Sequence, residues 1–106
     1  MSETLKAILS ELKTRFQELY GDRLVEMILY GSQARGDAVV GSDIDVLAIL
    51  KGDVNPVTEL GRVGDITFDL SCRNDTVVSC MFRDEATYNR GLGPYVRNVQ
   101  REGIRI

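Results

Sequence analysis

The first part of the chain carries apolar residues with the period of a helix. Six of them recur every three or four positions, so a helix would place all of them on one face. They are Leu5, Ile8, Leu9, Leu12, Phe16 and Leu19. Ser2 can cap the first turn, and Gly21 follows the last apolar position. The pattern predicts an amphipathic helix over residues 3–20 that covers the core.

Two apolar runs that follow are typical of β-strands and are separated by a glycine-rich loop. Residues 24–30 (LVEMILY) form the first run, which stops at a Gly-Ser pair. Residues 31–42 (GSQARGDAVVGS) are typical of a turn, with one helical turn at 33–35, and then a loop. The second run, residues 43–50 (DIDVLAIL), alternates at first and is then apolar throughout. That pattern suits a strand whose first residues open into a cleft.

A third segment alternates between apolar and polar residues. It covers residues 63–72 and follows a turn-like stretch over 51–59. Because side chains alternate between the faces of a strand, Thr67, Asp69 and Ser71 would share one face. The segment is therefore predicted to be a third strand with Asp69 on its polar face.

The remaining residues carry weaker signals. From residue 74 the pattern indicates a helical stretch that breaks at 91–94 (GLGP). A second helix is predicted from Pro94 to Glu102, with Gly103 as its stop. The last three residues can form a short final strand.

Length and composition limit the classes of function. The chain has 106 residues, 43% of them hydrophobic, so we expect residues 1–106 to form a single domain with one core. The net charge of −3 argues against the basic surface of a nucleic-acid-binding protein, and no direct contact with nucleic acid is expected. Charged residues interrupt the N-terminal apolar positions, so we expect no signal peptide, no membrane contact and a cytoplasmic location.

Histidine is absent, which excludes histidine bases and the commonest zinc ligands. The two cysteines, Cys72 and Cys80, are expected to be free thiols because cytosolic proteins rarely form disulfides. Chemistry would have to use carboxylates, hydroxyls, lysines, arginines and bound metal.

Asp43 and Asp45 are the strongest candidates for chemistry. In a strand their side chains share one face, where two carboxylates repel each other unless a cation lies between them. Mg²⁺ prefers such hard oxygen ligands together with phosphate oxygens and water. Asp69 would be the third carboxylate of a two-metal phosphoryl-transfer site, and it could accept the proton of the attacking hydroxyl.

Gly31, Ser32 and Arg35 are candidates for binding phosphate. A glycine lets backbone N–H groups approach a phosphate closely, and the serine hydroxyl adds a donor at the start of a helical turn. Arg35 could reach the same phosphates as a planar cation with several donors. We therefore expect the Gly-Ser turn to hold the triphosphate of ATP.

Two of these assignments, those of Arg35 and Asp69, have alternatives. Arg35 could instead form a surface ion pair, and Asp69 could pair with Arg62 or Arg73. Asp65 has the same strand parity as Asp69 and competes with it as third carboxylate. We favour Asp69 because it lies deeper in the apolar segment.

Gly31-Ser32, ten residues and then Asp43-Ile44-Asp45 resemble the signature of the polymerase-beta-type nucleotidyltransferase superfamily. Within it, the phrase LYGSQARGDAVVGSDIDVLAIL and the small size resemble the minimal nucleotidyltransferases. The resemblance implies an α/β (α+β) fold, in which a small mixed β-sheet is flanked by helices. It also implies Mg²⁺ as cofactor and ATP as cosubstrate, with the metal aspartates at Asp43, Asp45 and Asp69.

The family further implies a biological role. Its members frequently act as antitoxins beside a HEPN-type ribonuclease toxin, by transferring AMP to a toxin tyrosine. We therefore expect an ATP-dependent protein adenylyltransferase that assembles with such a toxin. The alternatives are an antitoxin that only sequesters its partner, or nucleotidyl transfer to a small molecule.

Overall fold

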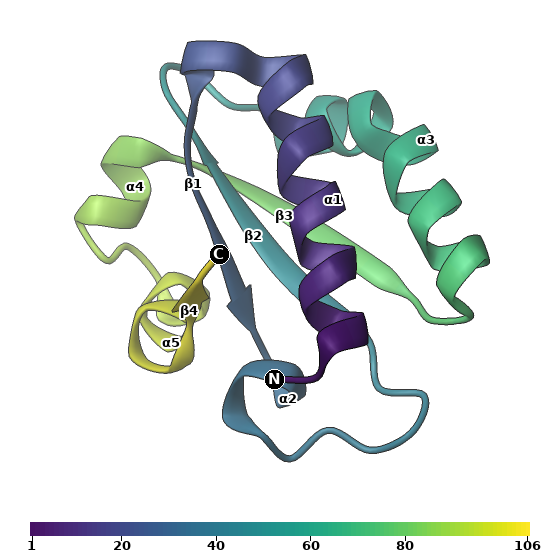
Figure 1. Ribbon diagram of the computed structural model, residues 1–106. Helices are drawn as coiled ribbons and strands as arrows, with labels where there is room; N and C mark the ends of the chain where they lie inside the picture. The colour runs from purple at the N-terminus through teal and green to yellow at the C-terminus, as the bar shows by residue number, and fades with distance from the viewer.

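The computed structural model describes all 106 residues. It contains some of the predicted helices and strands and differs from the prediction in others. Along the chain (Figure 1) the elements are α1 (Glu3–Tyr20), the 3-10 turn η1 (Gly21–Arg23), β1 (Leu24–Tyr30), α2 (Ser32–Arg35), β2 (Ile44–Leu50), α3 (Pro56–Asn74), β3 (Val78–Asp84), α4 (Glu85–Asn89), α5 (Pro94–Glu102) and β4 (Ile104–Arg105). The first helix has the predicted bounds, and its Ser2 cap accepts a hydrogen bond from the Leu5 N–H. None of the helices combines the length and the apolar character needed to cross a membrane.

The strands form one mixed sheet in the order β3-β2-β1-β4. β1 is antiparallel to both of its neighbours, whereas β2 and β3 are parallel and are connected through α3. Because β1 and β2 run in opposite directions, the last residue of β1 and the first residue of β2 lie at the same end of the sheet. Gly31 and Asp45 therefore meet there.

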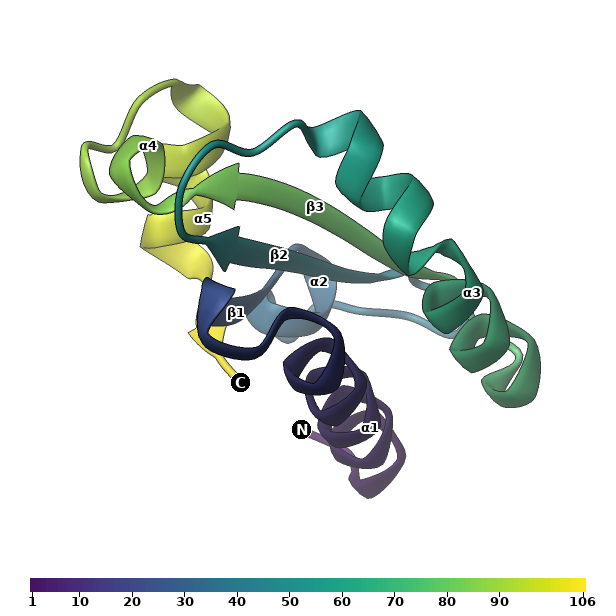
Figure 2. The ribbon, with the colours of Figure 1, turned by 90° about the horizontal axis from the view of Figure 1, so that it is seen from above.

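Helices cover both faces of the sheet (Figure 2). α1 and α3 lie on one face, where the larger core cluster includes Val46 and Ala48 of β2. α4 and α5 lie on the other face, where Leu47 and Ile49 pack with Val99 of α5. Since side chains alternate along β2, Asp45 points to the face that α5 covers.

The prediction of a strand over residues 63–72 is wrong, because these residues belong to helix α3. Asn55 caps this helix through its side chain, and Pro56 occupies its first turn, two start signals that outweigh the alternating pattern. The buried positions Glu59, Val63 and Leu70 have helical spacing, whereas Phe68, which the strand would have buried, is 71% exposed. The predicted turn over 51–59 accordingly ends at Pro56.

The third long strand is β3, in the region predicted to be weakly helical. Its residues Val78, Cys80 and Phe82 alternate into the larger core cluster, where Phe82 stacks on Phe16. The final helix and short strand are confirmed as α5 and β4. Both cysteines are free, as predicted.

Candidate functional site

The turn after β1 presents backbone N–H donors at the end of the sheet where β1 stops and β2 begins. Gly31 has φ +75°, and its carbonyl accepts the N–H groups of Ala34 and Arg35, which close the short helix α2. The N–H groups of Ser32 and Gln33 precede these first helical bonds, so the helix itself does not use them. The turn therefore offers N–H donors and the Ser32 hydroxyl to an anion.

Gly31 also lies directly against Asp45. A Cβ atom on Gly31 would lie 2.6 Å from Oδ2 of Asp45. The strand register explains this closeness, because Tyr30 pairs with Asp45 across β1 and β2. Only glycine combines this backbone conformation with this approach.

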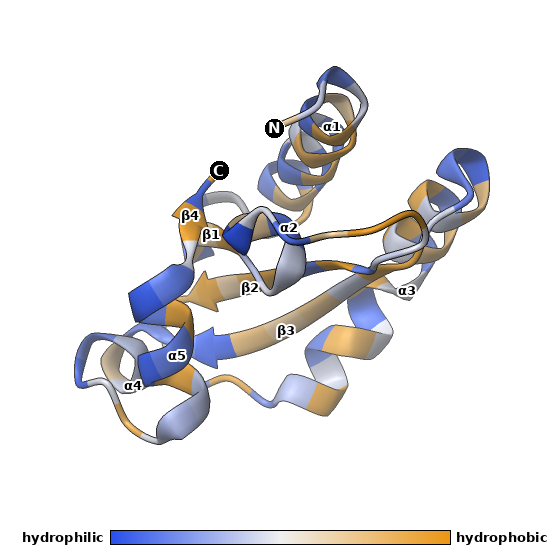
Figure 3. Ribbon diagram, turned by 90° about the horizontal axis from the view of Figure 1, so that it is seen from below, coloured by the Kyte–Doolittle hydropathy of each residue, from blue (hydrophilic) through white to orange (hydrophobic).

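The loop between α2 and β2 is fastened just before Asp43. The Ser42 hydroxyl accepts a hydrogen bond from the Val39 N–H at 2.9 Å, and the Gln33 side-chain amide donates to the Ser42 carbonyl. Asp43 follows this closure and is exposed. Figure 3 shows a hydrophobic stretch in the same loop, in which Val39 and Val40 are 74% and 105% exposed. Two apolar side chains therefore protrude from the loop that leads to the carboxylates.

Asp43 and Asp45 suit a bound cation. Burial raises the pKa of Asp45, and the nearby charge of Asp43 raises it further, while Arg35 opposes the shift. A divalent cation between the two carboxylates would offset this repulsion, and carboxylate oxygens are ligands that Mg²⁺ accepts. The two carboxylates of Asp43 and Asp45 together suit one cation. No cluster of three or more acidic, cysteine or histidine side chains is arranged to hold a metal ion.

The structure does not bring Asp69 to this pair, and the assignment of Asp69 as third carboxylate is corrected. Asp69 lies on α3, which packs against the opposite face of the sheet from the one that Asp45 faces. Its carboxylate accepts hydrogen bonds from Arg15 at 2.7 Å and from Arg73 at 3.1 Å. The competing Asp65 lies on the same helix and is exposed. The pairing with Arg73 that the sequence left open is the one observed.

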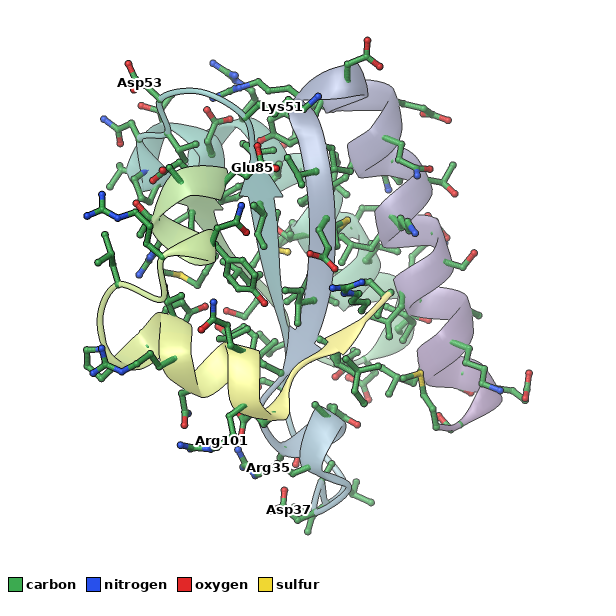
Figure 4. All side chains as sticks on the ribbon, turned by 90° about the vertical axis from the view of Figure 1, so that its left-hand side faces the viewer. Arg35, Asp37, Lys51, Asp53, Glu85 and Arg101 are labelled. Atoms are coloured by element: carbon green, nitrogen blue, oxygen red, sulfur yellow. The ribbon has the colours of Figure 1, made fainter.

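Arg35 forms surface ion pairs. It contacts Asp37 at 3.1 Å and Glu102 at 3.2 Å, and these hydrogen bonds raise its pKa. Figure 4 shows Arg35 and Asp37 beyond the C-terminal end of α5, at the opposite end of the sheet from Lys51 and Asp53. The ion-pair alternative therefore describes Arg35 in the present structure.

Glu102 is a residue of the site that sequence reasoning missed. This last residue of α5 accepts a hydrogen bond from the Gly31 N–H at 3.1 Å, and its side chain is 13% exposed. It lies 71 positions from Gly31, so no local pattern could have connected the two residues.

An aromatic wall beside Asp45 was also missed. The rings of Tyr30 and Tyr95 meet edge to face with centroids 5.5 Å apart, and the Arg83 guanidinium lies over the Tyr95 ring at 4.7 Å. Burial raises the pKa of both tyrosines. Next to Asp45 on β3 lies Ser79 rather than an acid. The α5 face of the site is therefore lined with aromatic and hydroxyl groups.

Comparison with known proteins identifies relatives. Residues 9–90 match the family model described as "Nucleotidyltransferase domain". The Methanocaldococcus jannaschii protein named "Putative protein adenylyltransferase MJ0604" is 31% identical over 102 residues, which cover 95% of this chain and 92% of that protein. The alignment therefore includes the whole region of the turn and the aspartates.

Solved structures share the fold. A "putative nucleotidyltransferase" from Sulfolobus solfataricus superposes with a TM-score of 0.55 at 20% identity and covers 99% of this chain and 86% of that one. A structure described as a toxin-antitoxin with AMP-PNP gives a TM-score of 0.60 at 16% identity, over 89% of this chain and 68% of that one. At these identities the likeness shows the fold alone.

Proposed function

This chain belongs to the nucleotidyltransferase domain family, and from that premise we propose that it transfers AMP from ATP to a hydroxyl group of a partner protein. The observation that carries the proposal is the contact between the Gly31 turn and Asp45, next to Asp43. It puts phosphate-binding donors beside a pair of carboxylates that suits a cation. We infer that residues 1–106 act as one minimal domain.

Each residue has a distinct role in this proposal. Asp43 and Asp45 would hold Mg²⁺, which when bound neutralises the phosphate charge that the two carboxylates would otherwise repel. The N–H groups of Ser32 and Gln33 and the Ser32 hydroxyl would bind and orient the triphosphate. Arg35 would fasten the turn rather than bind phosphate, since two carboxylates already engage it.

The proposed reaction is a substitution at the α-phosphorus of ATP. The acceptor oxygen forms a bond to that phosphorus, the bond to the bridging oxygen breaks, and pyrophosphate leaves. The hydroxyl proton passes to solvent or to an acceptor group, and Asp69 does not fill that role because of its place on α3. Holding the triphosphate in one orientation is the main contribution that this chain's residues can make.

We further propose that the acceptor is a tyrosine of a HEPN-type toxin, so that the chain acts as an antitoxin. The curated relative's name as a protein adenylyltransferase supports a protein acceptor, and the shared fold with a toxin-antitoxin structure is compatible with such a partner. Val39 and Val40 add local support, because exposed apolar side chains in the loop before Asp43 suit contact with a protein surface. A bound partner would cover them.

The test is a double variant, Asp43→Asn with Asp45→Asn. We expect it to lose Mg²⁺-dependent transfer of label from ATP labelled at the α-phosphate, while its fold persists. Because burial and Asp43 raise the pKa of Asp45, its charged form is unfavourable in the fold, so the variant should be at least as stable as the wild type at neutral pH. Asp69→Asn is the matched control. Wild-type transfer rates in the double variant would reject the proposed site.

A further inference from the structure

We propose that Glu102 is a positioning residue that holds the Gly31-Ser32 turn and Arg35 in the arrangement that binds the nucleotide. The inference rests on the proposed function of that turn. It assigns a role to the C-terminal end of α5, which contributes no donor of its own to the phosphates.

The contacts of Glu102 converge on the turn. One carboxylate oxygen accepts the Gly31 N–H at 3.1 Å, and both oxygens lie 3.2 to 3.4 Å from the Arg35 guanidinium. Gly31 caps the start of α2, and Arg35 is its last residue. The Gly31 carbonyl also accepts the Arg35 N–H. A single partly buried carboxylate therefore binds both ends of the short helix.

The position of Glu102 is unfavourable for the helix that carries it. A negative charge at the last residue of α5 lies at the negative end of the helix dipole. The contacts with Gly31 and Arg35 supply the positive groups that offset this cost. The placement is therefore explained by the turn and not by the stability of α5.

Gly103 fixes where this carboxylate lies. A Cβ atom on Gly103 would lie 2.4 Å from Cγ2 of Ile28 and 2.5 Å from the Val99 carbonyl oxygen. The corner between α5 and β4 can pack this closely on β1 only because residue 103 is glycine. Glu102 is therefore delivered to the turn by tight backbone packing.

Gly31 is held from both sides. Glu102 accepts its N–H group, and the Asp45 carboxylate lies 2.6 Å from where a Cβ atom on Gly31 would be. A displacement of the turn away from Glu102 would change both the direction of the N–H donors and the distance to the carboxylate pair. We infer that loss of Glu102 weakens nucleotide binding more than it slows the chemical step.

Two substitutions separate the contacts. In Glu102→Ala both are lost, and we expect the dissociation constant and the KM for Mg-ATP to rise about tenfold while kcat stays within about twofold. In Glu102→Gln the amide oxygen can still accept the Gly31 N–H, but the charge that attracts Arg35 is gone, so we expect a rise of about threefold. Glu26→Gln is the control, since it removes the same charge from another ion pair on β1.

Calorimetric titration with Mg-ATP and steady-state kinetics on folded variants decide between the outcomes. The expected order of affinity is wild type equal to Glu26→Gln, then Glu102→Gln, then Glu102→Ala. Wild-type affinity in Glu102→Ala would overturn the positioning role, as would tighter binding, which would mean that Glu102 competes with phosphate. If the wild type itself binds no Mg-ATP, the proposed function fails instead.

Discussion

At the scale of single residues, Gly31 meets two demands that no other amino acid satisfies together. Its φ of +75° is in the left-handed region, and Oδ2 of Asp45 lies where a side chain would begin. The same residue donates its N–H group to Glu102. The geometry of the site therefore depends on a position without a side chain.

Replacing Gly31 by alanine tests this dependence. We expect Gly31→Ala to lower the free energy of unfolding by about 1–2 kcal/mol through backbone strain. We also expect it to displace Asp45 and reduce transfer about a hundredfold or more, as misplaced catalytic groups do. Gly36→Ala is the control, because it also has positive φ but has open space around it. Similar transfer rates in both variants would show that the contact with Asp45 is unimportant.

Asp69 provides a prediction about pH. Hydrogen bonds from Arg73 and then Arg15 lower its pKa, so this contact adds stability that is complete above about pH 4. The contribution disappears as the pH falls through the lowered pKa, where the carboxylate becomes protonated. Asp69→Asn should therefore lose less stability than the wild type in acid, measured by thermal unfolding between about pH 2 and 7.

The same variant should transfer AMP within about twofold of the wild-type rate, because Asp69 lies on α3 and away from the carboxylate pair. A large loss of transfer without a loss of folding would contradict the correction and restore Asp69 as a site residue.

The residues differ in how far sequence could place them. Asp43 and Asp45 are two positions apart, and the Gly-Ser turn ends the neighbouring strand, so local pattern and strand pairing bring them together. Glu102 reaches Gly31 only through the packing of α5 on β1, which no spacing reveals. Asp69 was misplaced because its role was derived from a strand that is a helix.

At the scale of elements, α3 and β3 show why two periodicities compete. Residues 63–72 contain apolar positions at alternate and at helical spacing, and packing against α1 and the sheet selects the helical set. β3 is nearly half polar, so its alternation was weak in sequence, although all seven of its residues pair in register with β2. α1, which has a clear helical period, and β1, which is an apolar run, were predicted with the observed bounds.

Glu59 connects several elements at the other end of the sheet. This buried carboxylate of α3 accepts a hydrogen bond from the Tyr20 hydroxyl at 2.8 Å and pairs with Arg23 and Arg62 at 3.3 Å. Burial and the bond to Glu59 raise the pKa of Tyr20. The cluster ties α1 and η1 to the start of α3.

We expect Glu59→Ala to lower the free energy of unfolding by about 3 kcal/mol, because it leaves the buried Tyr20 hydroxyl and the partly buried Arg23 without their partner. Affinity for Mg-ATP should be unchanged below the unfolding transition, since the cluster lies beyond the far end of β2. Chemical denaturation and calorimetry measure the two quantities. Loss of affinity in the folded variant would show that α3 communicates with the site.

At the scale of the whole molecule, the sheet separates stability from function. α1 and α3 build the large core on one face, whereas the face covered by α5 contains Asp45, the aromatic wall and the clamp at Glu102. The end of the sheet where β1 stops and β2 begins carries the proposed phosphate-binding turn and the exposed Val39 and Val40. Under the proposed function, a partner protein that carries the acceptor hydroxyl would bind at this end.

The most direct test of AMP transfer is the intact mass of a candidate HEPN-type partner after incubation with this chain, Mg²⁺ and ATP. We predict that the partner gains the mass of one or more AMP groups. The gain should be absent without Mg²⁺, with the Asp43→Asn and Asp45→Asn variant, or with an ATP analogue whose α–β bridge cannot be cleaved. An unchanged mass for a partner that forms a stable complex with this chain in the presence of bound ATP would contradict the account.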